Sequence, residues 1–110
     1  MPSKSRSKTI TRDPNWLGPA VAPGEILLEE FLKPLELGQV EAARRLEISL
    51  NRMNEIVLGK RNITADTDLR LARYFGLSEG FFLGLQADYD LMERRRAIQA
   101  ELRAIRPRAA

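Results

Sequence analysis

The stretch SLNRMNEIVLGKRNIT, residues 49–64, carries the side chains best suited to contact with a macromolecular partner. Ser49 favours the start of a helix, because its hydroxyl can accept a hydrogen bond from a backbone amide two or three residues later. Hydrogen-bonding side chains then crowd the first two turns, and Gly59 precedes the basic pair Lys60 and Arg61. This combination is typical of a helix that contacts nucleic acid.

The donors and acceptors of this stretch match the edges of DNA bases in the major groove. Asparagine pairs with adenine, arginine with guanine and glutamate with cytosine, while leucine can touch the methyl group of thymine. Basic residues just past the helix, and a glutamine at the start of the preceding helix, suit phosphates. The predicted DNA-binding residues are Gln39, Ser49, Leu50, Asn51, Arg52, Asn54, Glu55, Lys60 and Arg61. The alternative is that this face is simply polar and solvated.

Two short helices joined by a tight turn must hold these side chains in place. We predict helices over about 39–47 and 50–58, joined by a turn of two or three residues, which is a helix-turn-helix arrangement. In such a unit the second helix enters the major groove with its first turns against the bases. The buried stripes predicted for the two helices are Val40, Ala43 and Leu46, and then Met53, Ile56 and Val57.

Further helices are predicted on both sides of this unit. Apolar residues recur at helical spacing after Pro23, and Pro34 must end or bend that helix. Thr64 is expected to cap a fourth helix that ends at Gly76, and Ser78 a fifth. The stripe predicted to be buried in the fourth helix is Leu69, Ala72 and Phe75. No strand pattern appears, so we predict an all-α domain of five helices with a C-terminal helical extension.

Composition excludes several classes of function. The 110 residues contain no cysteine and no histidine, which removes disulfides, thiol nucleophiles and the commonest general base and metal ligand. We therefore expect neither an enzyme nor a bound cofactor or metal. No apolar run is long enough to span a membrane, and no secretory signal is evident, so a cytoplasmic protein is expected.

The positive charge is concentrated at the two ends of the chain. The formal net charge is +3, yet the middle of the chain is acidic and both ends are rich in lysine or arginine. Basic ends can be solvated tails or can attract phosphates. We predict a flexible basic arm over residues 1–22, the helix-turn-helix domain over 23–92 and a basic helical tail over 93–110.

Three ordered segments resemble the HigA (VapI) family of antitoxins, which carry an XRE-type, lambda-repressor-like helix-turn-helix domain. The segments are PGEILLEEFL at 23–32, LGKRNITADTDLRLARYFG at 58–76 and FFLGLQADYDL at 81–91. The resemblance implies a type II antitoxin that neutralises a RelE-like ribonuclease toxin and represses its own operon as a dimer. The residues that match the DNA-facing positions of the family are Gln39, Asn51, Arg52, Asn54, Glu55, Lys60 and Arg61.

The chain departs from the family pattern at three positions. Gly38 stands where a capping serine or threonine is usual, so the second helix should begin more weakly. Glu47 stands where glycine is usual, so the turn must hold a non-glycine residue in a strained conformation. Ala22 replaces the common histidine before the Pro-Gly pair.

The expected partners are an operator inverted repeat in double-stranded DNA, a RelE-like toxin protein and a second copy of the chain. The dimer is expected to use the apolar face of Phe81, Phe82, Leu85 and Tyr89, which could instead close the core. Trp16 is a candidate toxin contact, because an arm tryptophan can anchor a protein partner. Two alternatives are a stand-alone repressor of the same fold and a toxin-neutralising module that binds DNA poorly.

Overall fold

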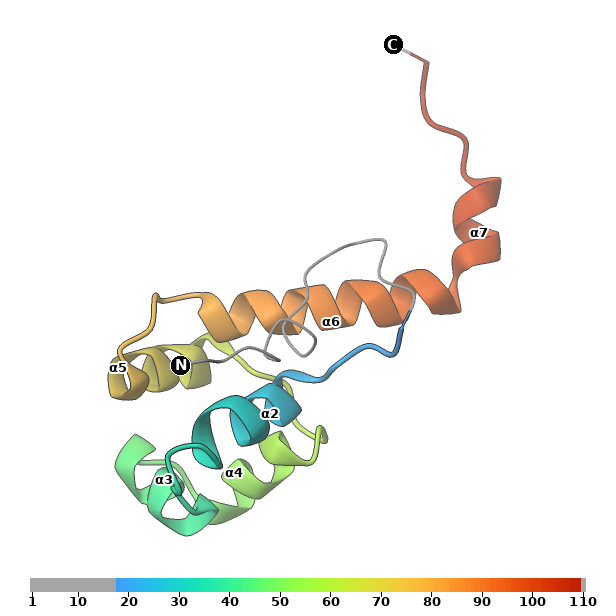
Figure 1. The fold of residues 1–110 in the computed structure, drawn as a ribbon. Coiled ribbons are helices and arrows are strands. Elements are labelled where there is room, and N and C mark those ends of the chain that lie inside the picture. The colour runs from blue at the N-terminus through green and yellow to red at the C-terminus, as the bar shows by residue number, and fades with distance from the viewer. Residues whose placement is uncertain (1–17, 110) are drawn as a thin grey trace.

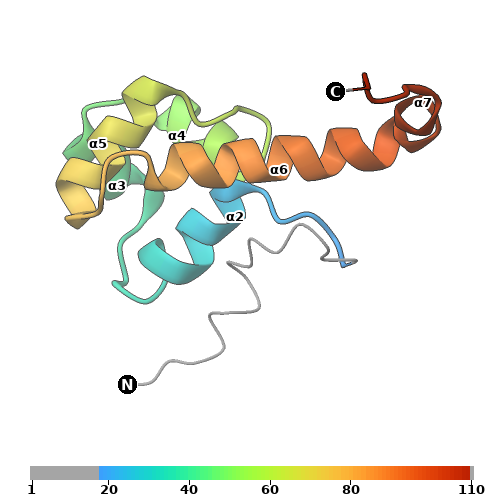
Figure 2. The same ribbon diagram turned by 90° about the horizontal axis from the view of Figure 1, so that it is seen from above.

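The computed structural model describes residues 18–109, and every regular element within this range is a helix. This confirms the predicted all-α fold. Helices α2 to α5 gather at one end of the molecule, and α6 extends beyond them to carry α7 (Figures 1 and 2). In chain order the helices are α2 (Pro23–Ile26), η1 (Leu27–Leu32), α3 (Gln39–Leu46), α4 (Leu50–Val57), α5 (Ala65–Phe75), α6 (Phe81–Ala97) and α7 (Gln99–Ala104).

The first helix begins at Pro23 as predicted, and it widens into a π-helix over its second half, η1. The Lys33 amide donates to the carbonyl of Leu28, five residues earlier, at 2.9 Å. Pro34 cannot donate a backbone hydrogen bond, so the regular ladder ends here. At the other end, Gly24 lies against the backbone of Ile56 in α4, which brings α2 close to that helix.

The core lies where α2, η1, α3, α4, α5 and the first half of α6 meet. Its largest fully buried side chains include Phe82, Leu27 and Met53. The ring of Phe31 in η1 packs against Phe82 at a centroid distance of 5.3 Å. This cluster holds α4 by its apolar face and leaves its opposite face outside.

Two of the three predicted helix caps are confirmed. The hydroxyl of Ser49 accepts from the Arg52 amide, and that of Thr64 accepts from the Thr67 amide. The prediction for Ser78 is wrong, because α6 begins at Phe81, after Gly80.

A carboxylate from another helix replaces the missing cap of α6. The buried Asp68 side chain of α5 accepts from the Gly80 amide at 2.6 Å and from the Leu83 amide at 2.8 Å. An acidic group at a helix N-terminus also interacts favourably with the helix dipole. Asp68 therefore joins the start of α6 to α5.

Two residues of the predicted buried stripes are on the surface. Val40 is 68% exposed, because α3 turns Ala42 inwards beside the predicted Ala43 and Leu46. Leu69 is 48% exposed, because α5 buries the side that carries Leu71 and Ala72. Only one edge of each apolar face was misplaced, because the other predicted residues are buried or pack against the core, namely Ala43, Leu46, Ala72 and Phe75.

The residues flanking α3 have the conformations that the sequence indicated. Gly38 precedes the helix without a side-chain cap. Glu47 follows it in the left-handed region, at φ 58° and ψ 45°. Glu36, in the turn after η1, is a second non-glycine residue with positive φ, at 52°. Both residues adopt a conformation that costs free energy for a side chain with a Cβ.

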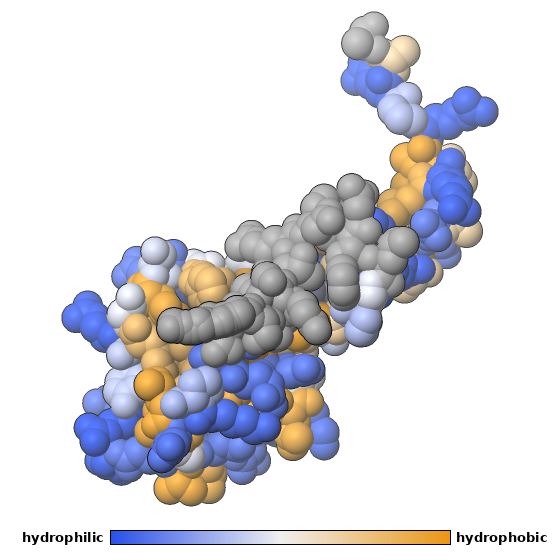
Figure 3. Space-filling model, viewed as in Figure 1, coloured by the Kyte–Doolittle hydropathy of each residue, from blue (hydrophilic) through white to orange (hydrophobic). Residues whose placement is uncertain are grey.

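The C-terminal segment is helical as predicted, with a break at Ile98 between α6 and α7. Helix α6 runs without interruption through the predicted domain boundary at 92 and 93. Leu102 and Ile105 are exposed, and Figure 3 shows apolar surface over α7 among hydrophilic side chains. Within residues 18–109, no helix is both long enough and apolar enough to cross a membrane.

Candidate nucleic-acid interface

Helices α3 and α4 form the predicted helix-turn-helix, with Glu47, Ile48 and Ser49 as the turn. Helix α4 buries Met53 and Ile56 and is called the recognition helix below. Because its buried face is held by the core, the side chains on its other face point away from the protein. The unit thus presents an exposed helix N-terminus, which is the part that enters a major groove in this motif.

The start of the recognition helix is exposed. Ser49 caps the helix through its hydroxyl, which accepts from the Arg52 amide at 3.0 Å. Leu50 is 42% exposed, and Asn51 is exposed beside it. This turn offers one apolar contact and one amide that can donate and accept at the same time.

A hydrogen bond between the two helices orients the next amide. Gln39, the first residue of α3, donates through Nε2 to Oδ1 of Asn54 at 2.5 Å. Both side chains are half-buried. Since Asn54 accepts through its oxygen here, its amide nitrogen remains as the donor of this side chain.

Arg52 occupies a different position from the one that the sequence suggested. Its Nη2 donates to Oδ2 of Asp66 at 2.7 Å and to Oγ1 of Thr67 at 2.6 Å. Both acceptors lie in the first turn of α5. The guanidinium predicted to read guanine is therefore directed at a neighbouring helix.

Glu55 and Arg61 form an ion pair beside the end of the recognition helix. Nη2 of Arg61 lies 2.6 Å from Oε1 of Glu55. The backbone amides of Lys60 and Arg61 both donate to the carbonyl of Glu55, which folds the basic pair close to the helix. The Lys60 side chain is exposed.

Hydrogen bonds from arginines lower the pKa of two carboxyl groups near this face. The pKa of Asp66 falls below its ordinary value of 3.8, chiefly because of Arg52 and then because of Arg70. The pKa of Glu41 in α3 is lowered by Arg44 and then by Arg45. Both carboxylates therefore stay ionised at neutral pH, and each reduces the positive charge offered to a phosphate.

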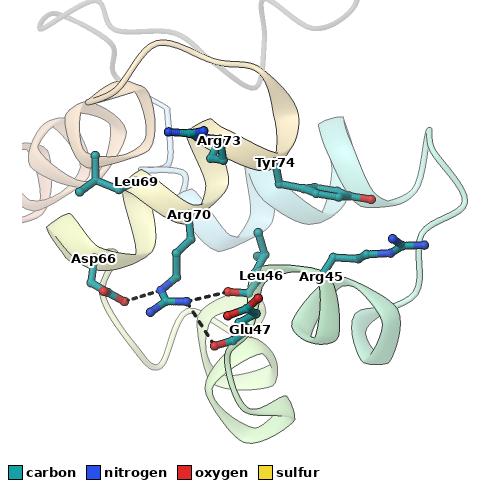
Figure 4. Close-up of a pocket in the computed structure, with 8 residues that line it drawn as sticks. All are labelled: Arg45, Leu46, Glu47, Asp66, Leu69, Arg70, Arg73 and Tyr74. Carbon is teal, nitrogen blue, oxygen red and sulfur yellow. Dashed lines mark hydrogen bonds and ion pairs between the residues drawn. The ribbon is translucent and has the colours of Figure 1, made fainter.

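Arg70 makes contacts beside this face that the sequence did not suggest. It binds Oδ2 of Asp66 through Nε at 2.9 Å. Its Nη1 also donates to the backbone oxygens of Leu46 and Glu47, at 2.9 and 3.3 Å. Figure 4 shows this arginine reaching from α5 to the C-terminal end of α3. The only sequence signal was a basic residue four positions after an acidic one, which predicts the ion pair with Asp66 alone.

The expected dimer residues require a correction. Phe82 and Leu85 are buried in the core of the protomer, so they leave almost no surface for a partner. Phe81 and Tyr89 are half-buried. For Phe82 and Leu85, the alternative that this face closes the core is the correct one. The candidate toxin contact, Trp16, lies outside the described residues.

Comparisons with known proteins agree with this geometry. No family model matches the chain. Virulence-associated protein I of Dichelobacter nodosus is 53% identical over 73 residues, which are 66% of this chain and 68% of that protein.

Two solved structures have the same fold and contain DNA. One is PA4674 of Pseudomonas aeruginosa in complex with its operator DNA, with a TM-score of 0.80, 36% identity, and coverage of 86% of this chain and 100% of that chain. The other is the antitoxin HigA of Pseudomonas aeruginosa with the higBA promoter, with a TM-score of 0.78, 36% identity, and coverage of 82% and 99%. The resemblance seen in the three sequence segments is thereby confirmed, and the chain belongs to the HigA family of helix-turn-helix antitoxins.

Proposed function

We propose that this protein is a sequence-specific DNA-binding antitoxin that represses its own operon as a dimer and neutralises a RelE-like ribonuclease toxin. The observation that carries the proposal is the exposed polar first turn of α4 in a chain whose fold matches relatives solved with promoter or operator DNA. A surface of this kind has the donors and acceptors needed to distinguish bases.

Base reading is assigned to the outward side chains at the start of the recognition helix. Asn51 can form two hydrogen bonds with adenine, and Leu50 can contact a thymine methyl group. Asn54 can donate to an acceptor on a base edge, because Gln39 holds its oxygen. The contact between Gln39 and Asn54 also fixes the amide before DNA arrives, which reduces the entropy lost on binding.

Phosphate contacts are assigned to the basic residues around this turn. Lys60 is exposed just past the recognition helix, and Arg61 can exchange its partner Glu55 for a phosphate. Glu55 then becomes available to accept from a cytosine amino group. The arginines of the C-terminal tail add sequence-independent attraction to DNA.

Dimerisation would place two recognition helices about 34 Å apart, in successive major grooves of an inverted repeat. The surface we assign to the pairing is the outer part of α6 together with α7, because Leu91, Leu102 and Ile105 are exposed there. Apolar side chains on a projecting helix gain stability when a second copy covers them. Toxin neutralisation is proposed from family membership, with the N-terminal arm as the contact.

A gel-shift titration on the chain's own upstream DNA, against scrambled DNA at two salt concentrations, tests the repressor function. Specific reading predicts a difference in affinity of about 10³ or more. Equal and salt-sensitive binding to both DNAs would favour the toxin-neutralising module without DNA specificity. Co-purification with the product of an adjacent gene separates an antitoxin from a stand-alone repressor.

Two substitutions distinguish the assigned roles. Asn51→Ala should weaken operator binding by about 1–3 kcal/mol and relax the preference at one base pair. Lys60→Ala should weaken binding to all sequences alike and reduce the salt slope by about one. Equal losses on all sequences for both variants would argue against reading by Asn51.

A further inference from the structure

One carboxylate connects the three helices around the candidate interface. Oδ2 of Asp66 in α5 accepts from Arg52 of α4 at 2.7 Å and from Arg70 at 2.9 Å. Arg70 in turn binds the backbone oxygens of Leu46, the last residue of α3, and of Glu47, which follows it. Figure 4 shows the second half of this chain of contacts, which runs along a shallow hollow between α3 and α5.

The Arg52 side chain is the more enclosed member of its ion pair. It is 25% exposed, whereas the Asp66 side chain is 56% exposed. The same Nη2 also binds the hydroxyl of Thr67, a residue that is 2% exposed. Two acceptors from one rigid helical turn therefore hold the guanidinium, and its planar shape suits such a fixed geometry.

The position of Arg52 makes this restraint consequential for DNA binding. Arg52 lies one residue after Asn51, in the turn that reads bases in the proposed function. An arginine released at this point could reach phosphates of any sequence, which would strengthen non-specific binding. A held arginine leaves base selection to its neighbours.

We propose that Asp66 determines DNA specificity by withholding the Arg52 guanidinium from DNA while fixing α4 against α3 and α5 through Arg70. This inference rests on the proposed function. It names the residues that limit binding to DNA of any sequence. Arg52 is then a positioning residue and not a reader of guanine. Asp66 supplies the negative charge that a phosphate would otherwise supply.

The test compares Asp66→Asn, Arg52→Gln and the double variant on operator and scrambled DNA across a range of salt concentrations. Glu79→Gln is the matched control, because it removes the same charge from an exposed position in the turn before α6. We expect Asp66→Asn to bind scrambled DNA about three- to tenfold more tightly at low salt and to steepen the salt slope by about one, since one phosphate contact is gained. The double variant and Glu79→Gln should show no such steepening.

Arg52→Gln provides a second measurement that does not require the Asp66 variant to fold. It should leave the base preferences of the protein unchanged at every operator position. A relaxed preference at one base pair would overturn the inference, because it would mean that Arg52 reads DNA itself. A salt slope of Asp66→Asn equal to that of Glu79→Gln would overturn it as well.

The failure of the proposed function has a different signature. If the wild-type protein binds operator and scrambled DNA equally, the repressor function is refuted. The salt slopes on scrambled DNA still decide whether Asp66 restrains Arg52. If the wild-type protein discriminates and the slopes do not separate, the inference alone is refuted.

Discussion

Replacing Gly24 with alanine should destabilise the domain at the contact between α2 and the recognition helix. A Cβ built on Gly24 would lie 1.7 Å from the carbonyl oxygen of Ile56 and 2.7 Å from its carbonyl carbon. Both obstacles are backbone atoms, so no change of side-chain rotamer relieves the overlap. The two helices would have to separate by on the order of 1 Å, which loosens the buried contacts around them.

The expected cost is at the upper end of the range for overpacked cores, about 3 kcal/mol. The free energy of unfolding of a domain of this size is about 5–15 kcal/mol in total, so the loss is a large fraction of its stability. At about 4–8 °C per kcal/mol, the melting temperature should fall by about 12–24 °C. Thermal unfolding followed by far-ultraviolet circular dichroism measures this change.

Gly38→Ala is the matched control for this substitution. A Cβ at Gly38 would meet nothing within 4 Å, and the backbone there has φ −71°. Its cost should stay below about 1 kcal/mol, which reflects only the poorer capping by alanine. A Gly24→Ala protein that melts within about 5 °C of this control would refute the reasoning, because the helix backbones would then be adjusting at little cost.

Three further predictions concern single residues. Asp68→Asn should lower the free energy of urea unfolding by about 2 kcal/mol, because the Gly80 and Leu83 amides bind different carboxylate oxygens and asparagine has only one oxygen. Glu47→Gly should stabilise the protein by about 0.5–1 kcal/mol, since glycine adopts φ 58° without strain. An unchanged midpoint of urea unfolding would contradict this. Hydrogen bonds from Arg52 and Arg70 lower the pKa of Asp66, so its contribution to stability is present above the ordinary carboxyl pKa and is lost only as the pH falls through the lowered pKa. With no histidine in the chain, the melting temperature should therefore be constant between about pH 5 and pH 8. A change of the melting temperature within that window would argue against a lowered pKa of Asp66.

The sequence by itself determined the features that depend on neighbours a few residues apart. The caps at Ser49 and Thr64 and the helix end at Gly76 were all predicted correctly. Each results from hydrogen bonds or backbone sterics within one helical turn, so the local order of residue types is sufficient. The spacing of these signals also located the helix-turn-helix.

Only the tertiary structure decided which groups meet across longer separations. The pairing of Arg52 with Asp66 and the capping of α6 by Asp68 join residues 12 to 15 positions apart, for which a helical pattern carries no signal. The assignment of Phe82 to the core and the exposure of Val40 were decided in the same way. A hydrophobic stripe shows that a helix has a buried face, but the packing of the neighbouring helices sets its rotation and the partners that its polar side chains find.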